Sequence, residues 1–99
     1  MTWKNILTYT RPNTGVDWHR VSRDIIVHIK TTYEDTGKSV SYKKELSGDG
    51  LTLTKTRTFN NESSYNEYRS DSVIISLADS IKTACDSKSI TKVVQSGDL

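Results

Sequence analysis

The stretch Leu51-Thr-Leu-Thr-Lys-Thr-Arg-Thr-Phe59, followed directly by Asn60-Asn61-Glu62-Ser63, decides the fold of this chain. Threonine occupies every even position from 52 to 58, and larger side chains occupy the odd positions. This period of two predicts a strand with threonines on one face and the larger side chains on the other. The Asn, Glu and Ser residues that follow are typical of a helix N-cap, so we expect the strand to lead directly into a helix.

The segments before this strand predict two more strands. Residues 38–46 have strand character, and we expect Val40, Tyr42 and Leu46 on one face. Residues 47–50, Ser-Gly-Asp-Gly, provide a tight return, because Gly and Asp adopt the positive φ angles that short hairpin loops require. An antiparallel hairpin of residues 38–46 and 51–59 follows. Residues 1–10 predict a further strand, which the Arg-Pro-Asn-Thr-Gly sequence at 11–15 ends.

Residues 20–36 fit either a strand or a helix, and the topology depends on the choice. The β-branched residues at 25–29 and their alternation with polar neighbours favour a strand. The apolar residues also fall on one helical stripe, at spacings of three and four: Trp18, Val21, Ile25 and Ile29, with Ser22, Ile26 and Tyr33 beside them. Ser22 then serves as N-cap and Gly37 lies beyond the C-terminus. The strand would be unusually long and leaves Trp18, Val21 and Ile26 unexplained, so we interpret the segment as a helix.

Residues 62–87 predict a helix with an internal break. Tyr65 and Tyr68 lie on one face, whereas the later apolar stripe points to the opposite side. That stripe comprises Ile74, Leu77, Ala78, Ile81 and either Ala84 or Cys85. One straight helix cannot bury both faces against the same sheet, and each residue of Ser70-Asp71-Ser72 is a good N-cap. We expect two helical segments or a sharp kink near Asp71, then a strand over residues 89–95 and a frayed tail from Ser96.

These elements predict an α+β fold of the ferredoxin-like type, β-α-β-β-α-β. Its four-stranded antiparallel sheet would have two helices on one face, the second broken near Asp71. One domain over residues 1–99 accounts for the whole chain. Only 33% of the residues are hydrophobic. We therefore expect either an unusually polar surface or additional burial against a partner subunit.

Composition also argues against several classes of function. The 14 basic and 12 acidic residues are spread without long runs, whereas nucleic-acid binding calls for a concentrated basic face. The single cysteine, Cys85, excludes an intrachain disulfide and is expected to be a buried or inert thiol. The two histidines and one cysteine do not form a metal-binding pattern, and we expect no metal and no cofactor. Without an apolar signal segment or an 18-residue apolar run, we expect no membrane contact and a cytoplasmic location.

A resemblance to a known family rests on three runs: residues 51–59, residues 61–68 (Asn-Glu-Ser-Ser-Tyr-Asn-Glu-Tyr) and residues 70–73 (Ser-Asp-Ser-Val). This half of the chain resembles the second half of dimeric α+β barrel proteins of the antibiotic biosynthesis monooxygenase-like type. That resemblance implies homodimerisation through the sheet face opposite the helices, and a ligand, where one exists, between sheet and helices. Activities in such families range from cofactor-independent oxygenation to haem degradation to none. The chain is also similar to small tailed-phage proteins of unassigned role, which implies the host cytoplasm.

The candidate ligand-binding residues are Tyr9, His28, Tyr42 and Arg57. His28 lies at the edge of the helical stripe, where it would face a pocket, although a hydrogen-bonded flank histidine explains it as well. Lys55 and Arg57 share the face of the apolar residues of their strand, where a cation needs an anionic ligand or a carboxylate partner. We favour the alternative that both side chains extend past the sheet edge into solvent. Arg57 is nevertheless the best single candidate for contacting an anion.

Two functions agree with these observations. The first is a small non-catalytic binding or assembly protein that is homodimeric or contacts another protein, encoded by a phage. The second is a cofactor-independent monooxygenase-like or small-ligand-binding dimeric α+β barrel. Asp17 is placed to orient His19 as a general base, but helix-entry chemistry explains the same residues, so we assign no catalytic residue. The second function needs a pocket with converging polar groups, whereas the first needs only a complementary surface.

Overall fold

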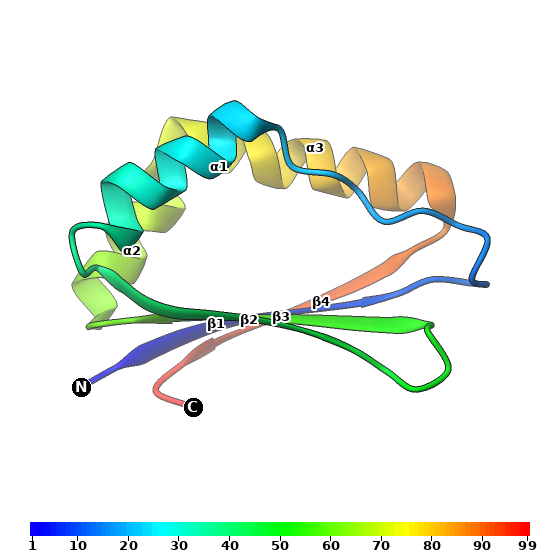
Figure 1. Ribbon diagram of the computed structural model, residues 1–99, viewed down its shortest axis with the longest axis horizontal. Helices are drawn as coiled ribbons and strands as arrows, with labels where there is room; N and C mark the ends of the chain where they lie inside the picture. Colours follow the sequence, from blue (N-terminus) through cyan, green and yellow to red (C-terminus); the bar gives the residue numbers. More distant parts are fainter.

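A four-stranded antiparallel sheet, covered on one face by helices, forms the frame of the molecule (Figure 1). The computed structural model describes residues 1–99. The elements in chain order are β1 (Trp3–Thr10), α1 (Arg23–Ile29), a π-helical turn η1 (Lys30–Glu34), β2 (Ser39–Leu46), β3 (Thr52–Phe59), α2 (Glu62–Ser70), α3 (Ser72–Lys88) and β4 (Thr91–Gly97). The strand order is β2-β3-β1-β4. The predicted β-α-β-β-α-β arrangement and the ferredoxin-like fold are confirmed.

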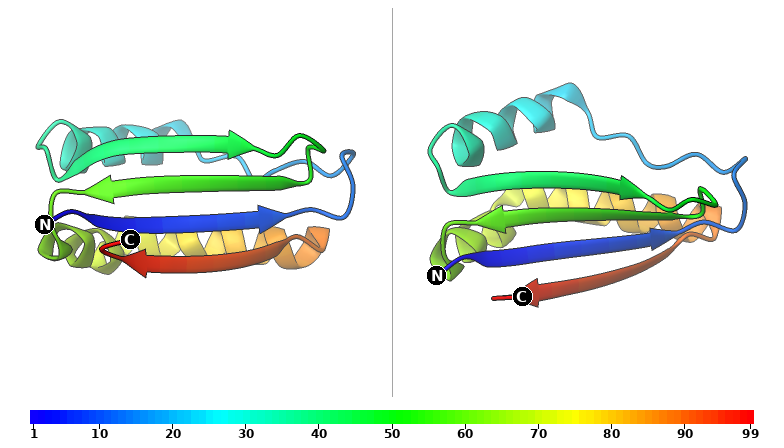
Figure 2. Two further views of the ribbon diagram at one scale, coloured as in Figure 1. Left: turned by 90° about the horizontal axis from the view of Figure 1, so that it is seen from below. Right: turned by 60° about the horizontal axis from the view of Figure 1, so that its bottom comes forward.

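The two faces of β3 are separated as its alternating sequence predicts. Leu53, Arg57 and Phe59 are buried beneath the helices. By the alternation of a strand, the threonines between them belong to the opposite face of the sheet, which no helix covers (Figures 1 and 2). In register, Thr54 of β3 is opposite Thr8 of β1, so a threonine pair lies near the centre of this open face. The helix-covered face and the open face of the sheet are therefore chemically distinct.

The β2–β3 hairpin forms as predicted, with one correction on its first strand. The backbone N–H of Ser47 donates to the carbonyl of Thr52, and Gly50 has a φ of +74° that favours glycine. A β-bulge lies between Ser39 and Ser41. Because of the extra residue, Val40 does not share a face with Tyr42 as expected, and it is 54% exposed.

Within residues 20–36 the chain is helical from Arg23 to Glu34, so the helix interpretation is confirmed over the strand. Ser22 occupies the N-cap position, but its side chain makes no capping hydrogen bond, contrary to expectation. The last turn widens into η1, where the N–H of Asp35 donates to the carbonyl of Lys30 over 2.8 Å. Gly37, with a φ of +80°, follows the helix as predicted. Ile26 is exposed and contributes nothing to the core.

The predicted break in the second helical region lies at Asp71. Its backbone is extended, and its side chain accepts a hydrogen bond from the N–H of Val73 over 2.9 Å, which caps α3. At the other end, Ser89 adopts a left-handed conformation with a φ of 57°. The final strand starts two residues later than predicted and continues to Gly97. Ser96 and Gly97 therefore belong to β4 and not to a frayed tail.

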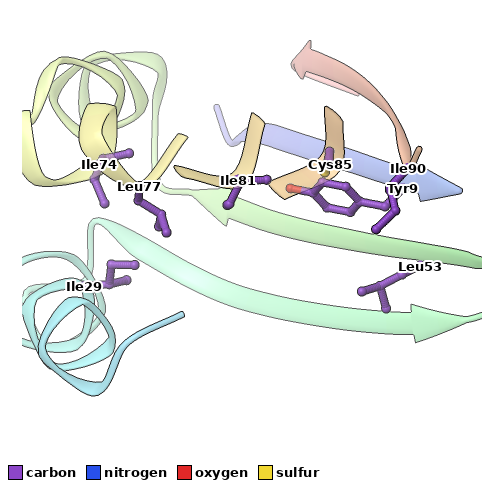
Figure 3. Close-up of a cluster of buried hydrophobic side chains, with 8 residues drawn as sticks. All are labelled: Tyr9, Ile29, Leu53, Ile74, Leu77, Ile81, Cys85 and Ile90. Carbon is purple, nitrogen blue, oxygen red and sulfur yellow. The ribbon is translucent and has the colours of Figure 1, made fainter. Parts of the chain in front are cut away.

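The core lies between the helices and the covered face of the sheet (Figure 3). Eight residues from five segments form it: Tyr9, Ile29, Leu53, Ile74, Leu77, Ile81, Cys85 and Ile90. Burial raises the pKa of the Cys85 thiol. Only 13 of the 99 residues are buried, and just one of them, Ser39, belongs to β2 or β4. The two edge strands therefore add little to the core. No helix has the length and apolar character needed to cross a membrane.

Candidate functional site

A cleft of about 600 Å³ lies between the sheet and α1. The entry segment of α1, residues 17–21, forms one wall, and side chains of β2 and β3 form the other. The lining residues are Arg11, Asp17, Trp18, His19, Arg20, Val21, Ile26, Ile29, Glu34, Tyr42, Lys44, Lys55 and Arg57. This volume is within the range of sites that bind small organic molecules.

Positive charge is concentrated at this cleft. Five arginine and lysine side chains line it against two carboxylates, a formal excess of three charges. The whole chain carries a formal net charge of only +2. The charges that appear dispersed in the sequence are therefore brought to one side of the molecule by the fold.

Two lysines face each other across the β2–β3 hairpin. Lys44 and Lys55 are directly opposite in the register of the two strands. Neither ammonium group forms an ion pair, because the five ion pairs of the molecule involve other residues. The Nζ atom of Lys55 lies 5.4 Å from the centroid of the Tyr9 ring. Burial, with a smaller contribution from Lys44, lowers the pKa of Lys55.

Arg57 has protein partners inside the fold, which corrects the expectation that it extends into solvent. It is only 8% exposed. Its Nη1 donates to Glu34 Oε2 over 3.0 Å and to Ser39 Oγ over 2.8 Å. Its guanidinium lies 4.4 Å from the centroid of the Tyr42 ring. The π-helical turn supplies the carboxylate that a buried cation requires, so this charge is neutralised without a ligand.

Tyr9 lies deeper, between the cleft and the core. It is 4% exposed, and its hydroxyl has no hydrogen-bond partner in the protein. In Figure 3 the hydroxyl points along the core toward Ile81. A narrow central cavity of about 80 Å³ touches Tyr9, Tyr42 and Arg57, together with Lys55. Three of the four candidate residues therefore lie around one space. Burial raises the pKa of Tyr9, which keeps its hydroxyl protonated as a potential donor.

His28, the fourth candidate residue, lies outside these cavities. Its Nε2 is 2.6 Å from Asp71 Oδ2, which also accepts the hydroxyl of Tyr33 over 2.7 Å. The hydrogen bond from His28, followed by that from Tyr33, lowers the pKa of Asp71. The hydrogen bonds of His28 and Tyr33 to Asp71 join α1 and η1 to the break between α2 and α3. His28 thus has the hydrogen-bonded role that the sequence analysis gave as the alternative to a pocket residue.

Several lining residues were not identified from the sequence. Arg11 donates to the carbonyls of Gly50 and Val16, and its guanidinium lies 4.6 Å from the centroid of the Trp18 ring. No hydrogen bond joins Asp17 to His19, although His19 lines the cleft. The position of Lys44 in the cleft could have been predicted, because an antiparallel hairpin closed by the Ser47–Gly50 loop places Lys44 opposite Lys55. No group of three or more His, Cys, Asp or Glu side chains is arranged to hold a metal ion.

Comparison with known proteins identifies the fold. No family model matches the chain, and no curated protein matches it in sequence. Among solved structures, Rv0793 from Mycobacterium tuberculosis has a TM-score of 0.64 at 12% identity, covering 98% of this chain and 94% of that one. A putative antibiotic biosynthesis monooxygenase from Deinococcus radiodurans has a TM-score of 0.57 at 9% identity, with coverages of 100% and 92%.

A third similar structure is a monooxygenase of Streptomyces coelicolor in complex with the ligand nanaomycin D. Its TM-score is 0.52 at 10% identity, with coverages of 98% and 88%. Two further similar structures are dimeric ferredoxin-like proteins, from Bacteroides fragilis and from an uncultured marine organism. The fold is thus that of antibiotic biosynthesis monooxygenase-like and dimeric ferredoxin-like proteins, in agreement with the resemblance found in the sequence.

Proposed function

We propose that this chain is a homodimeric α+β barrel protein that binds a small organic molecule between its sheet and α1. The observation that supports this most is the cleft of about 600 Å³ with both apolar and charged walls. Trp18, Val21 and Ile29 offer contact to an apolar body, and the cations offer contact to polar groups. The similar structures include a monooxygenase with a bound ligand.

The open face of the sheet supports the homodimer. Its centre is formed by side chains with methyl groups: Ile6, Thr8, Thr54, Thr56 and Val93. Val93 is more than half exposed, and no helix shields this face (Figure 1). Two such sheets stacked face to face would bury apolar surface that one chain leaves in water. A partner subunit would also account for the small number of buried residues.

The dimer is tested by light scattering after size exclusion over a dilution series. We expect a mass of twice the 11.2 kDa of the chain. Thr54→Arg places a charge at the centre of the open face and should shift the mass to that of the monomer. Thr31→Arg, on the exposed surface beside α1, is the matched control and should leave the dimer intact. A wild-type monomer at all concentrations would contradict the proposal.

The binding site is tested with a neutral aromatic probe, naphthamide, by following the tryptophan fluorescence. Trp18 lines the cleft and Trp3 does not, so the probe should quench emission in the wild type and lose most of this effect in Trp18→Phe. Oxygen uptake in the presence of aromatic substrates then separates binding from monooxygenase activity. A phage-encoded, non-catalytic assembly protein would use the sheet face and leave the cleft empty, so it would give no saturable quenching.

A further inference from the structure

We propose that the ligand of the cleft is a planar, apolar molecule with an anionic group, a carboxylate or an ionised phenol, which binds between Lys44 and Lys55. This inference rests on the proposed binding function and adds the chemical class of the ligand.

The two lysines occupy an unfavourable position for like charges. They are opposite each other on neighbouring strands, and like charges in this arrangement destabilise a sheet. Glu45, the carboxylate nearest in sequence, alternates onto the open face and cannot separate them. The chain therefore retains two lysines at opposite positions that no ion pair neutralises, and local costs of this kind are typical of functional sites.

The buried cation of the cleft is already neutralised by groups of the protein. Arg57 bonds to Glu34 and Ser39. Arg11, the remaining part-buried cation, is held by two backbone carbonyls and lies over Trp18. Arg20 is also unpaired but lies exposed at the entry to α1, so Lys44 and Lys55 are the unpaired cations on the sheet side of the cleft.

The environment of Lys55 also favours an anion. Its ammonium group is half-buried beside the aromatic ring of Tyr9, where water screens charge poorly. Desolvation and the neighbouring Lys44 both disfavour its charged form. An anion between the lysines would offset both effects, because its attraction to each ammonium is strongest where water is excluded.

The apolar body of the ligand is inferred from the opposite wall. Trp18, Val21 and Ile29 face this part of the cleft, and Tyr42 lies beside the lysines on β2. Two aromatic rings and two aliphatic side chains in the lining of one cleft favour a flat ring system over a flexible chain. Inorganic anions would satisfy the lysines but leave this wall in contact with water.

The proposal is tested by titrating the dimer with naphthoate and naphthamide of the same isomer, which differ only in the charged group. We expect naphthoate to bind at least about tenfold more tightly, the size of one charge-assisted hydrogen bond. Lys55→Met and Lys44→Met should each remove this preference. Lys82→Met, which removes the same charge from the exposed surface of α3, should not. Inorganic phosphate should compete only weakly.

Each outcome has a definite meaning. Equal binding of both probes would overturn the anionic ligand and leave the binding function standing. Binding of neither would refute the binding function itself. A naphthoate preference that survives in both lysine variants would overturn their assignment, and strong competition by phosphate would overturn the aromatic body. A second measurement needs no ligand: Lys44→Met should raise the melting temperature of the free protein by relieving repulsion. Lys82→Met, at an exposed position of α3, should not.

Discussion

Replacing Asp71 with alanine should destabilise the fold more than any other substitution of an aspartate. One carboxylate oxygen accepts the N–H of Val73 and caps α3, and the other accepts from Tyr33 and His28. Loss of the cap costs about 1 kcal/mol. The Tyr33 side chain is only 1% exposed, so leaving its hydroxyl without this acceptor costs about 1–3 kcal/mol. His28 is one-third exposed and can turn to water, which limits its contribution to below about 1 kcal/mol.

Together these losses amount to about 3 kcal/mol in the free energy of unfolding. For a chain of this length, such a loss corresponds to a fall in melting temperature on the order of 15 °C. Urea unfolding followed by circular dichroism measures the difference directly. Asp71→Asn keeps a capping side chain and one acceptor, and it should lose roughly half as much. Asp79→Ala, at an exposed position of α3 without an ion pair, is the control and should change stability by less than about 0.5 kcal/mol.

A specific result would refute this reasoning. If Asp71→Ala lost no more stability than Asp79→Ala, the carboxylate would not join α1 to the helix break in solution. If Asp71→Asn lost as much as Asp71→Ala, the negative charge alone would matter and the capping geometry would not. A double-mutant cycle with Tyr33→Phe then isolates the hydroxyl contact, since that variant removes the donor without removing the ring.

Three further predictions follow from the same structure. The pKa of Asp71 is lowered in the folded protein, so the unfolded state binds more protons below about pH 4. The stability of the fold should therefore fall as the pH drops through this range. Asp71→Asn should show a flatter acid dependence of the urea midpoint. Phe59 is fully buried against Tyr65 and Tyr68, so Phe59→Ala should cost about 3–5 kcal/mol and Phe59→Leu clearly less, by the same urea assay. Cys85 is buried and its pKa is raised, so an aromatic disulfide reagent should label it slowly in buffer and rapidly in concentrated guanidinium. Rapid labelling of the folded protein would show that the core opens around the last turns of α3.

The fold could be predicted from the sequence because its signals are local and agree with one another. The threonine alternation of β3, the Ser-Gly-Asp-Gly loop and the capping residues near Asp71 each favour one structure. The predictions from sequence were wrong where a tertiary contact determines the local structure. The bulge at Val40 adds a residue that no sequence pattern in β2 indicates. The strand β4 continues to Gly97, past its own apolar residues, because it pairs with β1.

The candidate site was less accessible to sequence analysis because its residues are far apart in the chain. Arg57 was expected in solvent, since its partner Glu34 lies 23 residues earlier and faces it only through the π-helical turn. Such a turn has no reliable sequence signature. The Lys44 and Lys55 pair is different, because hairpin register alone determines it. The geometry that brings these charges together was present in the sequence and could have been derived from the loop.

The alternation of residues along β3 links the proposed dimer interface to the proposed ligand site. This link can be tested by shifting the register of the strand. Its even residues face the proposed partner subunit, and its odd residues, Lys55 and Arg57, face the cleft. A shift of one residue in register would exchange these faces, placing threonines in the core and the cations on the dimer surface. Deleting Asp49 from the loop removes the side chain that accepts from Ser47 and Leu51 and fixes the turn. If register couples the two functions, this deletion should weaken naphthoate binding and dimerisation together, whereas Thr54→Arg alone should weaken only the dimer. Loss of one property without the other in the deletion variant would show that the cleft and the open face form independently.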